Sequence, residues 1–488
     1  MRGAFQRWRR AVVLAVAGLL VAAGTAGANV TLTQVSADPY TNATSQHATE
    51  VEPDTFSHHG TVVAAFQVGR FFNGGASDIG VVRSGDGGST WDAPGFLHDT
   101  FNSGDASSPY ERVSDPSVAY DAAHGVWIVS SIPLLPNTSV PTVFFNRSTD
   151  DGRTWGLAIS MPPPVSNSVD LDKNWTACDN HPSSPFYGHC YTELDNFGDG
   201  DLELMSTSTD GGLTWSVPIR TDGNDKGLGG QPVVQPSGRV VVPFESLNGT
   251  ISAFHSDNGG ASWSRALKVS GIRFHPVAGN LRTSPLPTAE IAADGTVYVA
   301  WEDCRFRKKC PSNDIVFSTS SDGVSWTDPA RIPIDPVTSS ADHFIPGLAV
   351  DPATAGASTH LALTYYFYPN ANCGGACRLD VGYISSPDGG AHWGAATQLA
   401  GPMGLSQIAN TSQGPMVGDY ISTSFAGGTA TTVFAVGRDA TTAPFNEAMY
   451  SPGRESVASL AQATQVASST GVFGAVGNGE THHALKDN

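Results

Sequence analysis

Basic residues are scarce in this chain. Lys and Arg together number 26 against 45 Asp and Glu, and charged residues make up only 15% of the 488 positions. A formal net charge of −19 disfavours contact with polyanions, so nucleic acid and anionic membrane surfaces are excluded as partners. Beyond Gly24 no apolar run is long enough to cross a membrane. Gly (54) and Pro (32) are plentiful instead, which favours short strands and tight turns over long helices.

The first 28 residues have the pattern of a secretory signal peptide. Four arginines precede a short apolar run over residues 11–24, and Ala26-Gly27-Ala28 supplies small residues before a cleavage site. Cleavage after Ala28 removes those four bases and no acids, so 22 bases face 45 acids and the net charge becomes −23. The sequence therefore predicts a secreted, extracellular protein with no membrane span in the mature chain.

Cysteine is also rare, and its placement is informative. The six Cys fall into three close pairs: Cys178/Cys190, Cys304/Cys310 and Cys373/Cys377. In an exported chain such local pairs predict disulfides that clip loops. The alternative, a metal site, is weaker because no Cys-x-x-Cys with matching His follows, and we predict no metal bound by these residues.

One motif, Ser/Thr-x-Asp-x-Gly-x-x-Trp, recurs six times and is called the box below. The boxes begin at Ser84, Ser148, Ser208, Ser256, Ser320 and Ser386, so neighbouring copies are 48 to 66 residues apart. The fifth copy is one residue shorter than the others. The acidic position is held by Asp86, Asp150, Asp210, Asn258, Asp322 and Asp388. Six copies at this spacing indicate a repeat architecture.

The residue types of the box suit a hairpin. A short Asp can accept hydrogen bonds from backbone N–H groups a few residues on. Gly allows the positive φ that a tight turn needs. The Trp begins the next strand and can pack into the apolar seam between neighbouring sheets. Each box is therefore predicted to be structural rather than catalytic.

Four strand-like runs accompany each box, and the box joins the third to the fourth. Around the fifth box these runs are 289–292, 296–301, 315–318 and 330–333. Four-stranded antiparallel units repeated around an axis are the blades of a β-propeller. Six boxes give six blades. Residues 416–450 and a spare N-terminal strand, 30–35, would complete a seventh, so seven blades are favoured and six is the alternative. The predicted domains are 1–28 (signal peptide), 29–453 (propeller) and 454–488 (a low-complexity tail).

Boxes of this form resemble those of the sialidase-like superfamily, also called BNR or Asp-box repeat proteins. The resemblance covers roughly residues 50–453, and the phrases Asp172-Lys173-Asn174-Trp175 and Val417-Gly418-Asp419-Tyr420 look like those of secreted bacterial members. It implies an all-β propeller. The superfamily includes sialidases, other glycan hydrolases and lyases, and non-catalytic binders, so the resemblance leaves the activity open.

A sialidase-like site would lie at the mouth of the central channel, near the starts of the first strands and the ends of the second strands. Such a site needs an arginine cluster, because the substrate carries a carboxylate. The substrate-binding candidates at these places are Arg70, Arg112, Arg305, Arg438, Asp172 and Asp419.

Catalysis in this class uses a tyrosine nucleophile helped by an acid, since a carboxylate nucleophile would be repelled by the substrate. A separate Asp donates the proton. The catalytic candidates by position are Tyr420 or Tyr366, Glu245 or Glu302, and Asp115.

Two further motifs were weighed. Arg331-Ile332-Pro333 follows Trp326 of the fifth box, so it lies on an outermost strand and does not correspond to the Arg-Ile-Pro element of sialidases, which precedes the first box. The acidic segment 195–201 offers oxygens for a structural Ca²⁺, but it lacks EF-hand spacing, and a plain Asp/Gly turn is the favoured interpretation. No other cofactor is predicted.

Two functions follow from the sequence. The first is a secreted sialidase-like propeller acting on extracellular glycans as an exo-glycosidase, and the alternative is a non-catalytic propeller that binds glycan or protein. Arg and Tyr converging at one mouth would favour the enzyme. A mouth lined by neutral or aromatic residues would favour binding.

Overall fold

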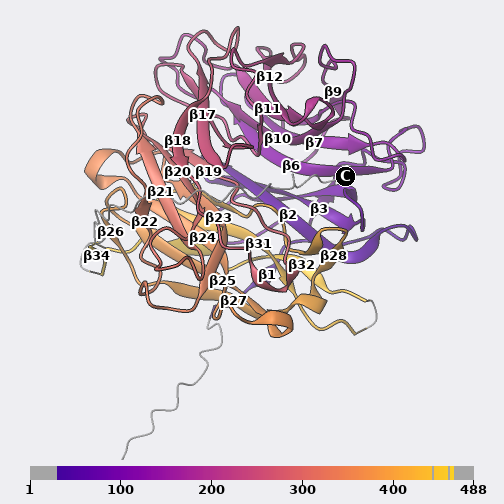
Figure 1. The fold of residues 1–488 in the computed structure, drawn as a ribbon. Coiled ribbons are helices and arrows are strands. Elements are labelled where there is room, and N and C mark those ends of the chain that lie inside the picture. The colour runs from indigo at the N-terminus through magenta and orange to yellow at the C-terminus, as the bar shows by residue number, and fades with distance from the viewer. Residues whose placement is uncertain (1–29, 442–443, 460–461, 466–488) are drawn as a thin grey trace, which may run out of the picture.

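The computed structural model describes residues 30–441, 444–459 and 462–465 (Figure 1). The predicted signal peptide and most of the predicted tail lie outside these residues. The described chain is all-β, as predicted, with five one-turn 3₁₀ segments: η1 (Phe197–Asp199), η2 (Ala278–Asn280), η3 (Gly356–Ser358), η4 (Gly374–Ala376) and η5 (Leu405–Gln407). No helix among the described residues is long and apolar enough to cross a membrane.

In chain order the described strands are numbered as groups 1 to 7, each with antiparallel pairing inside it, and groups 7, 1 and 2 belong to one 13-stranded sheet. Group 1 contains β2 (Gln46–His58), β3 (Thr61–Arg70), β4 (Ala76–Ser84) and β5 (Gly95–Phe96). Group 2 contains β6 (Arg112–Asp121), β7 (Val126–Leu134), β8 (Phe144–Ser148) and β9 (Ile159–Ser160). Group 3 contains β10 (Leu171–Cys178), β11 (Cys190–Asn196), β12 (Leu202–Ser208) and β13 (Ile219–Arg220). Group 4 contains β14 (Gly227–Leu228), β15 (Val233–Val234), β16 (Val240–Ser246), β17 (Thr250–Ser256) and β18 (Leu267–Gly271).

The remaining three groups follow the same plan. Group 5 contains β19 (Thr288–Ile291), β20 (Val297–Asp303), β21 (Asp314–Ser320) and β22 (Ala330–Arg331). Group 6 contains β23 (Asp342–Val350), β24 (Leu361–Tyr368), β25 (Arg378–Ser386) and β27 (Thr397–Gly404). Group 7 contains β30 (Ser422–Ala426), β31 (Thr429–Gly437), β32 (Glu447–Ser451) and β1 (Thr33–Gln34). Two short two-stranded sheets complete the described strands. One pairs β26 (His392–Trp393) with the distant β34 (Thr464–Gln465), and the other is the local hairpin of β28 (Ala409–Thr411) and β29 (Gly414–Met416).

The first strands of the groups contact one another in order. β2 contacts β6, and the succession continues through β10, β15, β19, β23 and β30. β30 in turn contacts β2, so the succession returns to its start. In Figure 1 the indigo strands β2 and β3 accordingly lie beside the yellow strands β31 and β32.

Both ends of the described chain attach to group 7. β1 pairs with β32 through Thr33–Ser451 and Gln34–Tyr450, as predicted for the spare N-terminal strand. The segment after residue 453 also contributes strands, since β33 (Arg454–Ser456) pairs with β31 and β34 pairs with β26. The first part of the predicted tail is therefore packed on the sheets.

Each box lies between the third and fourth strand of its group and has one hydrogen-bond pattern. In the first box, Asp86 Oδ1 accepts from the Thr90 N–H at 2.8 Å and from Ser84 Oγ at 2.8 Å. The Ser84 hydroxyl also accepts from the Gly88 N–H at 2.8 Å. The equivalent Asp, Ser and N–H bonds recur in the other five boxes, with Asn258 using its amide oxygen in the fourth. The short polar side chain thus closes the turn.

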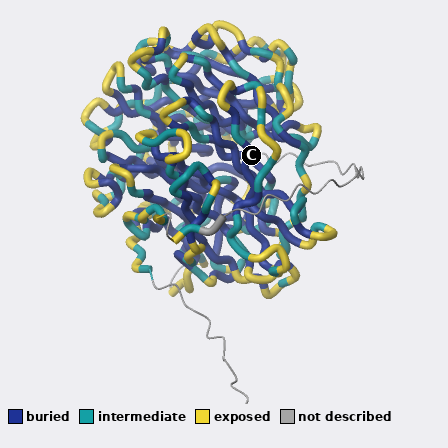
Figure 2. Tube along the Cα trace, turned by 90° about the vertical axis from the view of Figure 1, so that its left-hand side faces the viewer, coloured by how far each residue is buried: buried dark blue, intermediate teal, exposed yellow. Residues whose placement is uncertain are grey.

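The box tryptophans join neighbouring groups. Trp215 of group 3 stacks on Phe145 of group 2, with ring centroids 3.8 Å apart and an interplanar angle of 12°. Trp263 and Trp393 are buried against Tyr191 and Phe317 of the preceding groups. In Figure 2 the buried residues follow the strands while the exposed ones gather in the peripheral loops. The apolar seams between groups therefore form the core.

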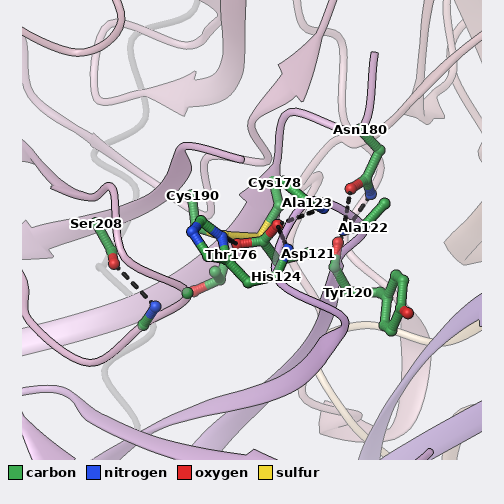
Figure 3. The surroundings of a disulfide bond; sticks show 12 residues. Tyr120, Asp121, Ala122, Ala123, His124, Thr176, Cys178, Asn180, Cys190 and Ser208 are labelled. Atoms are coloured by element: carbon green, nitrogen blue, oxygen red, sulfur yellow. Dashed lines mark hydrogen bonds and ion pairs between the residues drawn. A yellow bond between two sulfur atoms is a disulfide. The ribbon is translucent and has the colours of Figure 1, made fainter. Parts of the chain in front are cut away.

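All three predicted disulfides are present: Cys178–Cys190, Cys304–Cys310 and Cys373–Cys377. Figure 3 shows the first, which joins the end of β10 to the start of β11. Beside it, the Asn180 side chain donates to the Tyr120 carbonyl at 2.8 Å and accepts from the Ala122 N–H at 2.8 Å. These bonds fix the end of β10 to group 2.

Candidate functional site

The predicted mouth is filled by a buried ion network. Lys173 donates to Asp419, and its Nζ lies 3.8 Å from Asp115 Oδ1 and 4.0 Å from Glu52 Oε1. Arg282 reaches the same Asp419 through Nε at 2.8 Å and Nη2 at 2.5 Å. All five side chains are at most 2% exposed. These basic and acidic side chains therefore pair with one another inside the protein.

The space left at this mouth is small. Asp115, Lys173, Asp419 and Tyr420 line a cavity of about 20 Å³. Sugar-sized ligand pockets occupy roughly 300–1,000 Å³. The mouth therefore brings together three of the predicted site residues, Asp115, Asp419 and Tyr420, but leaves no room there for a sugar.

Three of the predicted arginines, Arg70, Arg305 and Arg438, contact different side chains. Arg70 donates to Gln67 Oε1 at 2.6 Å, and Arg305 pairs with Asp303 at 2.6 Å. Arg438 is exposed and lies over the Tyr450 ring, 4.4 Å from its centroid. The structure thus gives these three arginines no common ligand.

Arg112 is the one predicted arginine that another accompanies. Burial lowers the pKa of Arg112, and the positive charge of Arg70 contributes to that shift. Its guanidinium donates to Asn73 at 2.7 Å and to Glu111 at 3.1 Å. Arg70 and Arg112 are both buried, and each donates hydrogen bonds to neighbouring side chains.

Both predicted tyrosine nucleophiles donate hydrogen bonds to backbone carbonyl groups. Tyr366 is fully buried and donates to the Ala435 carbonyl at 2.9 Å, and burial raises the pKa of its phenol. Tyr420 donates to the Pro116 carbonyl at 3.2 Å and meets the Trp175 ring edge-on at 5.1 Å.

The predicted acids are buried as well. Glu302 accepts from the Ile345 N–H at 3.0 Å and from Thr283 at 2.9 Å, and burial raises its pKa well above the usual range. Glu245 accepts from Ser284 at 3.4 Å, and burial raises its pKa to about 7. Asp172 is buried and accepts from the Lys173 N–H at 3.1 Å.

A larger cavity lies further along the channel. It has a volume of about 360 Å³ and is lined by residues of all seven first strands, β2, β6, β10, β15, β19, β23 and β30. Its lining extends to the exposed residues Ala293 and Pro352 in the turns that join first to second strands. Trp175, Gln231 and Thr288 line both this cavity and the mouth, so they separate the two.

The cavity wall is mostly neutral. Aliphatic residues make up about half of the lining, hydroxyl, amide and aromatic groups make up most of the rest, and the described lining includes no Arg or Lys. The polar groups include those of Thr55, Ser57, Thr176, Asn180, Gln231, Ser422 and Ser424, and the rings those of Phe56, Trp175 and Phe425. Such a wall suits an uncharged polar ligand with apolar faces.

Two carboxyl groups are the exception. Asp54 Oδ2 accepts from the Val118 N–H at 2.7 Å and Oδ1 accepts from Ser422 at 3.0 Å. Burial raises the pKa of Asp54 to about 7. Burial, together with the charge of Asp54, raises the pKa of Glu290 to about 8. The cavity thus holds two acids that interact with each other.

Sequence reasoning missed this cavity for a specific reason. Candidates were collected at the starts of first strands, whereas the cavity lies beside the middle and end of those strands. Glu290 lies within β19, where an acid between Ala289 and Ile291 was the available signal.

A second carboxylate cluster could hold a cation. Ligand atoms of Asp314, Asp335 and His343 lie within 4.8 Å of one another. However, Arg307 and Arg331 already bind both carboxylates at 2.5–2.9 Å. Two guanidinium charges therefore neutralise the cluster, and a metal ion would have to compete with them.

The predicted Ca²⁺ segment, 195–201, forms a closed turn. Asn196 donates to Asp199 Oδ2 at 2.8 Å, and Lys226 donates to the Asp199 carbonyl at 2.7 Å. Gly200 takes a φ of 75° to end η1. These contacts support the turn interpretation of this segment.

Beside that turn, three acids are buried between groups 3 and 4. Asp195 lies directly opposite Glu203 in the β11–β12 ladder, and Glu193 is two residues before Asp195. All three are 0% exposed, and burial is the main cause that raises the pKa of each. For Glu203 the pKa rises to about 8.

Glu203→Gln should therefore stabilise the protein at alkaline pH. Between pH 4.5 and about 8 the folded state keeps a proton that the unfolded state releases, so stability falls as the pH rises through this window. The amide removes that cost, and we expect a gain of roughly 4 kcal/mol at pH 8 and less than about 1 kcal/mol at pH 5. Thermal unfolding from pH 5 to 8 measures it. Equal differences from wild type at every pH would contradict the shift.

Comparison with known proteins agrees with this fold. Residues 60–273 match the family model of the BNR repeat-like domain. The match supports a fold of the sialidase-like, BNR-repeat type for this part of the chain. No curated protein sequence matches the chain.

Several solved structures are similar. An ulvan lyase from a polysaccharide lyase family has a TM-score of 0.50 at 11% identity, over 88% of this chain and 98% of that one. A protein of unknown function from Dyadobacter fermentans DSM 18053 has a TM-score of 0.46 at 17% identity, over 73% and 99% of the two chains. The NanB sialidase of Streptococcus pneumoniae has a TM-score of 0.41 at 13% identity, over 87% and 71%.

Proposed function

We propose that this protein is a secreted, seven-bladed β-propeller that binds extracellular glycans. The seven strand groups, and the cyclic contacts of their first strands, support seven blades around one channel. Three disulfides fit an exported protein, as the N-terminal sequence pattern predicts. The ulvan lyase that shares the fold acts on a polysaccharide, which supports a glycan as the ligand.

The observation that carries this proposal is the channel cavity. Its volume of about 360 Å³ is enough for a terminal sugar, and its hydroxyl, amide and aromatic wall matches the polar edges and apolar faces of a pyranose. The lack of Arg and Lys in its described lining disfavours sialic acid, whose carboxylate needs a cation. We therefore propose a neutral sugar terminus as the ligand.

Glycan binding can be tested with a cavity-filling variant. Ala177 lines the cavity, so Ala177→Leu should block it, and Trp175→Ala should remove an aromatic face. Each change should weaken binding at least tenfold, which corresponds to about 1.4 kcal/mol. Lys268→Ala, at an exposed site that does not line the cavity, is the control and should bind like wild type.

The measurement is binding of the purified chain to an array of neutral and sialylated oligosaccharides, followed by calorimetry on the best ligand. Melting temperatures show whether each variant is folded. Absence of binding to any neutral glycan, or binding that Ala177→Leu leaves intact, would refute the proposal.

A further inference from the structure

The two cavity carboxyls come from strands that are not neighbours. Asp54 lies on β2, whereas Glu290 lies on β19, which contacts β15 and β23. In the cyclic succession of first strands, two strands separate β2 from β19 on one side and three on the other. Both residues line the same cavity, so the two carboxyls face it from well-separated parts of its wall.

The two acids also differ in how they are held. Asp54 accepts from a backbone N–H at 2.7 Å and a hydroxyl at 3.0 Å, and acceptor bonds favour a carboxylate. Glu290 is half-buried at the cavity wall, where a hydrogen bond from the Ile291 backbone is the main opposing influence on its raised pKa. Burial raises the pKa of both groups, and the acceptor bonds of Asp54 keep its pKa below that of Glu290.

We propose that Asp54 and Glu290 are the general base and general acid of a hydrolytic site for neutral glycosides. This inference rests on the proposed glycan binding and adds turnover to it. Glycoside hydrolysis generally uses a pair of carboxyl groups that flank the scissile bond, and Asp54 and Glu290 line one cavity from strands that are not neighbours. We assign the inverting form of the reaction to this pair.

The reaction needs only water. The Glu290 carboxyl gives its proton to the glycosidic oxygen while the bond from C1 to that oxygen breaks. The oxygen of a water molecule forms the new bond to C1 from the opposite face, and Asp54 takes the proton that the water loses. The products are a free sugar and an alcohol. Proton transfer through solvent then restores Glu290 as the acid and Asp54 as the carboxylate.

The pKa values support these roles near neutral pH. Glu290, with a pKa of about 8, is mostly protonated at pH 7.5, and Asp54, with a pKa of about 7, is mostly ionised. His181 is the other titratable residue in the described lining, and its Nε2 lies 3.0 Å from the Val234 carbonyl. The rate should therefore be greatest between pH 7 and 8 and fall on either side.

The neutral wall then defines the substrate class. Without a cation to hold a carboxylate, the cavity disfavours sialosides and uronides, and Trp175 offers a ring for an uncharged pyranose face. We expect turnover of neutral aryl glycosides and none of sialosides.

The test uses the full purified chain and a panel of p-nitrophenyl glycosides, neutral and sialylated. Glu290→Gln and Asp54→Asn should each lower kcat by 10²–10⁴-fold. Glu290→Gln should lose less on 2,4-dinitrophenyl glycosides, whose leaving group needs no proton. The control is Glu50→Gln, another buried carboxyl with a pKa of about 8 that does not line the cavity, and it should keep wild-type turnover. Proton NMR of the first product should show the inverted anomer.

The outcomes separate the two proposals. Glycan binding with no turnover of any glycoside refutes the hydrolytic site and leaves the binding function standing. If the chain neither binds nor hydrolyses any glycan, both proposals are refuted. Turnover that Glu290→Gln leaves unchanged, or a retained anomer as product, overturns the roles given to these two acids. Glu290→Gln that binds glycan like wild type but fails to turn it over is the expected result.

Discussion

Lys173→Met should lower the free energy of unfolding by about 3–5 kcal/mol. Lys173 is 2% exposed and lies within 4.0 Å of three buried carboxylates, those of Glu52, Asp115 and Asp419. Removing its charge takes a buried cation away from these three acids, while Arg282 keeps its two N–H bonds to Asp419. Uncompensated buried carboxylates are far more costly than a lost surface contact.

The measurement is chemical denaturation of the variant beside a matched surface control. Arg239 pairs with Asp257 at 2.5 Å, but the two side chains are 26% and 57% exposed. Arg239→Met should therefore cost less than about 1 kcal/mol. If both variants lower the free energy of unfolding by the same small amount, the buried network at the mouth stabilises the protein no more than a surface ion pair does.

This network also shows why the candidate site could be predicted only in part. The phrases around Asp172 and Asp419 were recognisable in the sequence, and the structure does place Lys173, Asp419 and Tyr420 around one small space. Arg282 was not identified, because it belongs to no repeat position and meets Asp419 across 137 residues of sequence. Whether an arginine faces a ligand or a neighbouring carboxylate depends on such distant pairings.

Local patterns, in contrast, could be predicted well. The bonds of Asp86 to Ser84 and Thr90 span at most four residues, so residue type and spacing determine them. The Cys304–Cys310 and Cys373–Cys377 bridges close six and four residues and are similarly local. The pairing of β1 with β32 is distant, yet a spare strand and an incomplete repeat at opposite ends predicted it.

Deleting residues 30–36 should destabilise the protein more than any single substitution at its surface. The deletion removes the strand that pairs with β32, the buried Val35, and the Val35 N–H bond to the Met449 carbonyl at 2.9 Å. It also removes Ser36, which accepts from the Met449 N–H at 2.8 Å and donates to buried Glu50 at 2.7 Å. Burial of one Val is worth about 1.5–3 kcal/mol, and each unsatisfied buried polar group costs about 1–3 kcal/mol.

The expected loss is thus at least about 4 kcal/mol, with self-association through the exposed edge of β32. Thermal unfolding and light scattering of the purified variant measure both effects. Thr33→Ala is the control, because Thr33 pairs with Ser451 through its backbone and its exposed side chain can be lost at little cost. Since β1 is the outermost strand of group 7, its removal leaves the first strands and their cavity in place. A variant as stable and monomeric as wild type would show that the N-terminal strand does not secure group 7.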